Sequence, residues 1–85
     1  MNSQEINQLL EKLKSEIEGI QPDDEKGQAL LRELSADIRD LLEQTEAKQP
    51  MMQRIQASID HFEVTHPELT AALSSLFNIL SNAGI

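Results

Sequence analysis

The chain has 85 residues, a net charge of −8 at pH 7, two Phe, and no Trp, Tyr or Cys. Its length predicts a single domain, residues 1–85, and the lack of Cys excludes disulfides, thiolate metal sites and a Cys nucleophile. Residues 1–47 carry 12 acidic and 5 basic side chains, whereas residues 48–85 carry 3 and 2, so the first half repels nucleic acid and anionic lipid and attracts a basic protein surface.

The N-terminal sequence has neither the basic nor the apolar region of a signal peptide. No apolar run reaches the roughly 18 residues that a membrane-spanning helix needs. We therefore expect a soluble, cytoplasmic protein without a membrane partner. The scarcity of aromatic rings argues against base stacking, so nucleic acid is not expected as a partner either.

Residues 3–18 have the apolar spacing of an amphipathic helix, alternating steps of 4 and 3 residues. Gly19 is expected to end this helix in a left-handed turn. The stripe consists of Ile6, Leu10, Leu13, Ile17 and Ile20.

A second helix is predicted over residues 24–47, after the turn at Pro22, with Asp23 or Asp24 as its cap. The short connection makes the first two helices an antiparallel hairpin. The apolar stripe of the second helix consists of Leu30, Leu31, Leu34, Ile38, Leu41 and Leu42. Its outer face is assigned Glu33, Asp37, Asp40 and Glu43.

Pro50 leaves two interpretations open. The apolar register continues in phase through it, which favours one kinked helix and a bundle of three helices. However, Pro inside a helix costs about 3 kcal/mol, and Thr45 and Lys48 interrupt the apolar seam. Gln49 is a poor cap, so the start signal for a new helix is weak. We favour a break near Pro50 and a third helix over residues 51–64. Met51 and Met52 are expected to fill the core near the helix start, with an adaptable binding surface as the alternative.

The residue before a Pro avoids helical angles, so the chain is expected to bend at His66. Pro67 and Glu68 both favour the first turn of a fourth helix, over residues 67–82. Gly84 is expected to cap this helix, with Ile85 packing back on the last turn. The stripe of the fourth helix consists of Leu69, Leu73, Leu76 and Leu80, widened by Phe77.

The stretch Phe62-Glu63-Val64-Thr65-His66-Pro67-Glu68-Leu69 and the terminal Asn82-Ala83-Gly84-Ile85 resemble a family of short bacterial proteins. That family is catalogued as domain-of-unknown-function family 4404. The resemblance covers almost the whole chain. Its most specific residues are Phe62, His66, Pro67 and Leu69 at the corner, and Gly84 and Ile85 at the end. It implies a bacterial, helical, cytoplasmic protein, and it supplies no catalytic residue, cofactor or partner.

The residues that could carry chemistry do not form a recognisable constellation. His61 and His66 are five apart across a helix end, whereas helical metal ligands sit three or four apart. His66 is interpreted as a corner residue whose ring bonds a backbone group, and His61 as a surface residue. No Ser has the strained turn of a nucleophile, and no Gly-rich phosphate loop exists. We expect no enzyme, no metal, no cofactor and no small-molecule substrate.

The sequence thus predicts an all-α bundle of four amphipathic helices, arranged as two hairpins. We expect a homodimer, because a thin core with few aromatics gains from association. The expected function is a non-enzymatic protein-interaction module. The alternative is an acidic decoy or inhibitor that covers a basic, nucleic-acid-binding surface of another protein. The fourth helix lacks charge from Ala71 onward, which marks a candidate interface formed by Leu69, Leu73, Leu76, Phe77 and Leu80.

Overall fold

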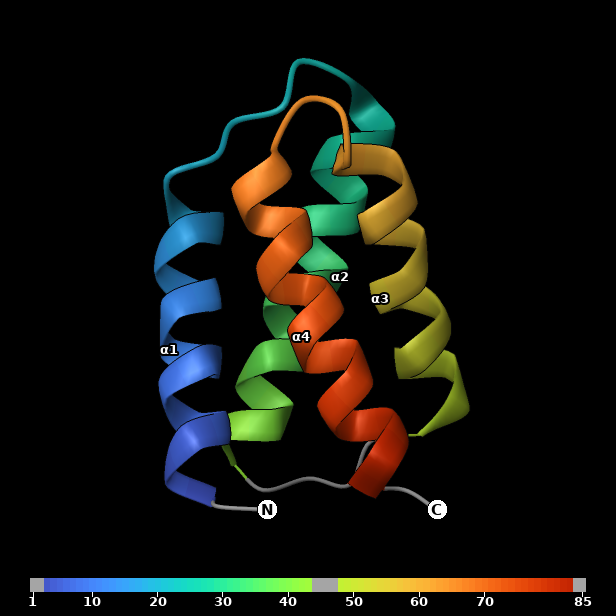
Figure 1. Cartoon of the computed structure of the whole chain (residues 1–85). Coiled ribbons are helices and arrows are strands. Elements are labelled where there is room, and N and C mark those ends of the chain that lie inside the picture. The colour runs from blue at the N-terminus through green and yellow to red at the C-terminus, as the bar shows by residue number, and fades with distance from the viewer. Residues whose placement is uncertain (1–2, 44–47, 84–85) are drawn as a thin grey trace.

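The computed structural model describes residues 3–43 and 48–83, which form four helices. These are α1 (Ser3–Glu18), α2 (Glu25–Leu42), α3 (Gln49–Phe62) and α4 (Pro67–Ala83). The helices run alternately up and down, each packs against the next along the chain, and α4 packs back against α1 (Figure 1). The predicted all-α bundle of two helical hairpins, α1–α2 and α3–α4, is therefore confirmed.

The apolar stripes of all four helices meet in one core. Leu13, Ile55, Leu73 and Leu76 have no exposed surface, and Phe62 is the largest of the fully buried side chains. The stripes converge because apolar residues spaced by 3 and 4 positions lie on one side of each helix. The other buried apolar residues are Leu10, Ile17, Leu31, Leu34, Ile38, Leu41, Met51, Leu69, Ala72 and Leu80.

The chain breaks before Pro50 and does not continue as one kinked helix. Lys48 has extended backbone angles, φ −115° and ψ 167°, and Pro50 lies in the first turn of α3. In that turn the missing N–H of Pro leaves no helical bond unmade, which is why Pro is tolerated there. The sequence predicts that α2 continues to residue 47, but the helix ends at Leu42 and Glu43 is its cap, so the prediction is already wrong at residue 43. Residues 44–47 lie outside the described residues.

The end of α1 differs from the predicted left-handed cap. The Gly19 N–H donates to the Glu16 carbonyl and the Ile20 N–H to the Ile17 carbonyl, both at 3.1 Å. These bonds span three residues and tighten the last turn, so the backbone of Gly19 does not enter the left-handed region. Ile20 packs against the core. The corresponding prediction for Gly84 and Ile85 falls outside the described residues.

A partly buried ion pair joins α2 to α3. Arg54 donates from Nε to Asp37 Oδ2 at 2.9 Å and from Nη2 to Oδ1 at 2.7 Å. Only 3% of Asp37 is exposed, so its predicted place on the outer face is wrong. Hydrogen bonding to Asp37 raises the pKa of the Arg54 guanidinium above its usual value. The pair therefore fixes one side of α3 against α2.

The start of α2 depends on a close approach between the first connection and the helix. Asp24 caps the helix, and its side chain accepts from the Gly27 N–H at 2.8 Å. Gly27 is buried, and a Cβ there would lie 2.8 Å from Asp24 Oδ1 and 2.9 Å from Pro22 Cβ. Pro22 is held in place from α2, because Gln28 Nε2 donates to its carbonyl at 3.1 Å.

Replacing Gly27 with Ala is expected to destabilise the protein by about 1 kcal/mol. The crowded Cβ displaces the rigid Pro22 ring and the capping carboxylate, which costs more than the roughly 1 kcal/mol that Ala gains in helix propensity. Urea unfolding measures the change, with the exposed neighbour Lys26→Ala as the control. A variant more stable than the parent chain would contradict the close packing at Gly27.

Candidate functional site

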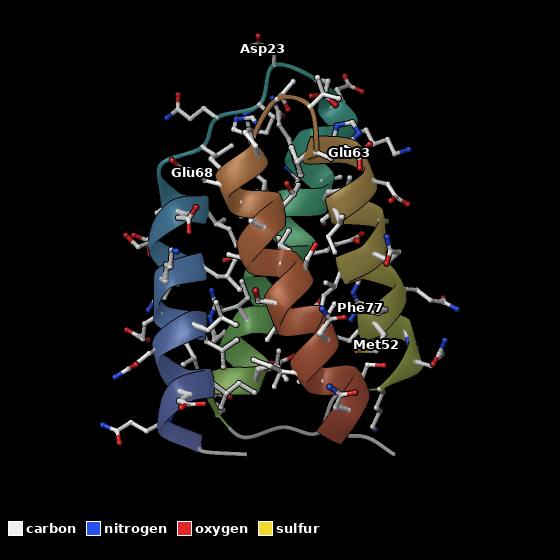
Figure 2. All side chains as sticks on the ribbon, in the orientation of Figure 1. Asp23, Met52, Glu63, Glu68 and Phe77 are labelled. Atoms are coloured by element: carbon white, nitrogen blue, oxygen red, sulfur yellow. The ribbon has the colours of Figure 1, made fainter. Side chains whose placement is uncertain are left out.

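Polar and titratable side chains gather at one end of the bundle. The α1–α2 connection, residues 19–24, and the α3–α4 turn, residues 63–66, lie together at this end (Figure 1). Figure 2 shows Asp23, Glu63 and Glu68 here, each on a different segment of the chain. We call this region the loop end. It contains the corner sequence from Phe62 to Leu69 on which the family resemblance rests.

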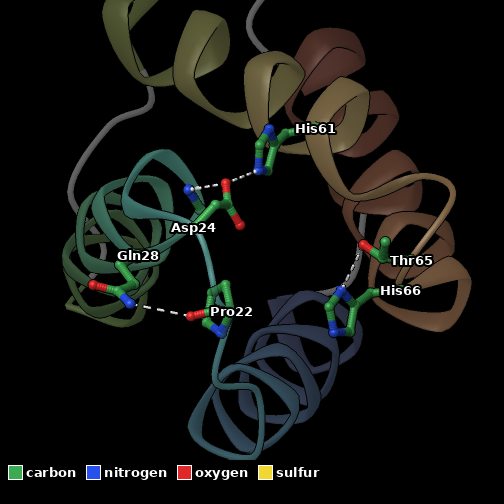
Figure 3. A network of polar contacts seen from close by, with 7 residues as sticks. Pro22, Asp24, Gln28, His61, Thr65 and His66 are labelled. Atoms are coloured by element: carbon green, nitrogen blue, oxygen red, sulfur yellow. Dashed lines mark hydrogen bonds and ion pairs between the residues drawn. The ribbon is translucent and has the colours of Figure 1, made fainter.

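Asp24 is the centre of the contacts at the loop end. His61, in the last turn of α3, places Nε2 at 2.7 Å from Asp24 Oδ2, the same oxygen that accepts from the Gly27 N–H (Figure 3). The Gly27 N–H lowers the pKa of the Asp24 carboxyl most, and His61 lowers it further. His61 is half-buried at the surface and joins the first connection to α3 through Asp24, a contact that the prediction of a surface residue did not include.

The corner before α4 is built around Phe62. The rings of His61 and His66 both meet Phe62 edge to face, with centroids at 4.9 and 5.5 Å. His66 Nδ1 lies 3.0 Å from the Thr65 hydroxyl (Figure 3). The prediction that the ring bonds a backbone group is wrong within the part of the chain that the structure describes. The backbone of His66 closes the turn instead, because its N–H donates to the Phe62 carbonyl at 2.8 Å. Pro67 begins α4, and Leu69 is buried beside this corner.

Asp24 gives the folding stability a predictable dependence on pH. The pKa of Asp24 is lowered in the folded state relative to the ordinary value of 3.8. Its contribution is therefore complete above that value and is lost as the pH falls through the lowered pKa. Asn keeps the capping acceptor without the charge. The stability difference between the parent chain and Asp24→Asn should be largest above about pH 4 and shrink below it.

Urea unfolding at several pH values tests this dependence, with the exposed neighbour Asp23→Asn as the control. A difference that stays constant with pH, or that Asp23→Asn reproduces, would contradict the assignment to Asp24.

Two open clefts flank His66. The first, of about 430 Å³, lies between the end of α1 and the start of α4. The second, of about 490 Å³, lies between the first connection and the end of α3. The first is lined by Ser15, Glu16, Gly19, Ile20, His66, Pro67, Glu68 and Leu69. The second is lined by Gln21, Pro22, Asp23, Asp24, His61, Phe62, Thr65 and His66.

The loop end offers carboxylates and imidazoles, but their arrangement is that of structural contacts. One nitrogen of each imidazole is engaged, by Asp24 for His61 and by Thr65 for His66. Within residues 3–43 and 48–83, no group of three or more His, Asp or Glu is placed to hold a metal ion. The Asp24–His61 pair was missed from the sequence, because its members are 37 residues apart and neither stands in a motif.

The predicted interface on α4 requires a correction. Leu69, Leu73, Leu76 and Leu80 are buried in the core of the chain itself, so they are not available to a partner. The physical reason is that one apolar stripe cannot serve both the bundle and a second chain. Phe77 alone of the predicted set is half-buried, packed at the edge of the core.

The outward side of α4 carries no charged residue beyond the first turn of the helix. The sequence has no charged residue from Ala71 to Ala83. Half-buried Met52 and Ile59 of α3 and Phe77 of α4 pack against the core, and Figure 2 shows Met52 and Phe77 on this side. We call this surface the neutral face. The exposed α4 residues on it include Ser74 and Asn78, whereas Ala71 and Ser75 line a depression with Leu9 and Lys12 of α1.

Comparison with known proteins gives a family and no function. Neither the curated proteins nor the solved structures contain a match to this chain. Across the described residues, no helix combines the length and the apolar character needed to cross a membrane. The family model described as Domain of unknown function (DUF4404) matches residues 6–85, nearly the whole sequence, including the corner at His66 and Pro67. The chain therefore belongs to the DUF4404 family.

Proposed function

We propose that this protein is a non-enzymatic helical interaction module that pairs with a second copy of itself through the neutral face. The observation that carries the proposal is the uncharged outward side of α4, beside the half-buried Met52 and Phe77. The centres of protein interfaces are depleted in charge and enriched in Met and aromatic residues. A helix that faces only water normally carries charged residues on its outward side.

The distribution of charge favours a second copy as the occupant. Residues 1–47 carry a net charge of −7 and residues 48–85 a net charge of −1. Two identical acidic molecules repel least when their neutral faces meet and their acidic hairpins point away from each other.

The neutral face is small for a stable interface. It is two helices wide, and α4, with 17 residues, is about 25 Å long. Standard interfaces bury about 800 Å² on each partner, so we expect a reversible dimer with a dissociation constant in the micromolar range.

The charged side chains that contact each other inside the bundle support a non-enzymatic role, because they pair with one another. Asp37 with Arg54 and Asp24 with His61 each join two segments of the bundle. These contacts hold the fold, which leaves the outward surfaces for recognition. A cytoplasmic location is part of the proposal, and fractionation of cells that express the chain at its native level would test it.

Charge placed on the neutral face should abolish pairing. Ser74 and Asn78 are exposed and four residues apart, so Ser74→Asp with Asn78→Asp adds two negative charges to this face without disturbing the core. The matched control is Asn7→Asp with Gln8→Glu, which adds the same charge to exposed positions of α1. We expect the parent chain and the control to sediment as dimers and the α4 variant as a monomer. Equal behaviour of the two variants would exclude the neutral face.

A second candidate function follows from the net charge of −7 on residues 1–47. In that case the protein covers a basic, nucleic-acid-binding surface of another protein. Binding would then weaken steeply as salt is raised, whereas contacts through the neutral face would be nearly insensitive to salt. The salt dependence of partner binding therefore separates the two functions.

A further inference from the structure

The cleft between the end of α1 and the start of α4 contains a carboxylate oxygen without a hydrogen-bond donor. Oε1 of Glu16 is buried and has no partner within the described residues. A buried acceptor left unsatisfied is unfavourable, and the penalty is larger when the group is charged. Glu16 also lines the cleft of about 430 Å³, so its carboxylate belongs to the wall of that cleft.

The end of α1 adds negative potential at the same place. The last turn of a helix carries partial negative charge on its carbonyl oxygens, and basic residues usually compensate for it. The last turn of α1 contains no basic residue and instead contains Glu16 and Glu18. A positive group is therefore missing at the position where the unsatisfied oxygen lies.

The other residues that line the cleft favour a cation that has a charged head and an apolar stem. Glu68 contributes a second carboxylate, and His66 is the only lining side chain that can carry a positive charge. Lys12 lines the adjacent depression together with Glu68, but neither Glu16 nor Glu68 forms an ion pair with a described residue. Half-buried Ile20 and exposed Pro67 supply apolar surface beside the carboxylates. Long basic side chains present the same combination, an apolar stem with a charged head.

We propose that this cleft binds the side chain of an Arg or Lys from a basic segment of a partner protein. The head group donates to Glu16 and lies at the negative end of α1, while its methylene stem packs on Ile20 and Pro67. This inference goes beyond pairing through the neutral face and rests on the second candidate function, in which the chain covers a basic surface of another protein. It also gives the acidic first half of the chain a defined anchor point for a basic surface.

The test is a titration of the full chain with short peptides, followed by two-dimensional ¹H–¹⁵N NMR. The probe is acetyl-Gly-Arg-Gly-amide, and its uncharged counterpart contains citrulline in place of Arg. The variants are Glu16→Gln, which removes the charge in the cleft, and Glu11→Gln, which removes the same charge from an exposed position of α1. Spectra of the free variants show directly whether each one is folded.

We expect the Arg peptide to shift the amide signals of Gly19, Ile20, Glu68 and Leu69. The citrulline peptide should have no such effect. Because a charge-assisted hydrogen bond is lost, Glu16→Gln should bind at least about tenfold more weakly, whereas Glu11→Gln should bind as the parent chain does.

Three results would overturn the inference: equal shifts with citrulline, equal losses in Glu16→Gln and Glu11→Gln, or no binding of the Arg peptide. Spermidine that competes at Glu16 more tightly than the peptide would reassign the cleft to free amines. Sedimentation of the chain without peptide measures self-association separately. A negative result for peptide binding in the cleft can therefore be distinguished from a negative result for the dimer.

Discussion

Leu73→Ala is expected to destabilise the protein by about 2 to 5 kcal/mol. Leu73 has no exposed surface and lies at the centre of the four-helix core, so the truncation leaves a cavity that its neighbours can fill only in part. A domain of this length is stable by roughly 4 to 13 kcal/mol, so the loss is a large fraction of the whole.

Urea unfolding measures the loss, and the exposed Ser75→Ala on the same helix is the control, expected within about 0.5 kcal/mol of the parent chain. A cost for Leu73→Ala no larger than that of Ser75→Ala would mean that Leu73 is not part of the core. Leu73 was also part of the interface predicted from the sequence. A polar substitution at this buried position would unfold the chain, so it cannot test that interface.

Arg54→Ala is expected to cost about 2 to 3 kcal/mol, because it leaves the buried Asp37 carboxylate without its two donors. The estimate lies below the range for a fully buried pair, since 38% of the Arg54 side chain is exposed and water partly screens the interaction. The control is Arg32→Ala, which removes an exposed Arg from α2 and should change the stability by less than about 0.5 kcal/mol.

A double replacement separates the pair from the packing around it. Asp37→Leu with Arg54→Met removes both charges and fills the space with apolar atoms, so it should recover most of the loss. An Arg54→Ala chain as stable as Arg32→Ala, or a double variant as unstable as Arg54→Ala, would contradict the assigned role of the pair.

The helical bundle could be predicted because the sequence pattern that specifies each helix lies within that helix. The apolar residues of each helix repeat every 3 or 4 positions, and the break at Pro50 follows from the chemistry of Pro itself. Helix ends were less predictable, since they depend on competing backbone bonds. Gly19, for example, ends α1 through bonds to Glu16 without entering a left-handed conformation.

The contacts between helices could not be predicted, because they join residues far apart in the sequence. Asp37 looks like an outer residue of an acidic helix, and only the approach of α3 turns it into the buried partner of Arg54. The one sequence signal was that Arg54 is the only Lys or Arg between residues 49 and 85. The interface on α4 was misassigned for a related reason: Leu73 and Leu76 face the core, and the side of α4 that stays exposed is polar and uncharged.

Sedimentation equilibrium of the unmodified chain over a wide range of concentrations tests the central proposal most directly. The chain has a mass of 9.5 kDa. Pairing through the neutral face predicts a rise to twice that mass with concentration, with a midpoint that changes little between low and high salt. A mass that stays at the single-chain value at every concentration would contradict self-association as the function of this surface.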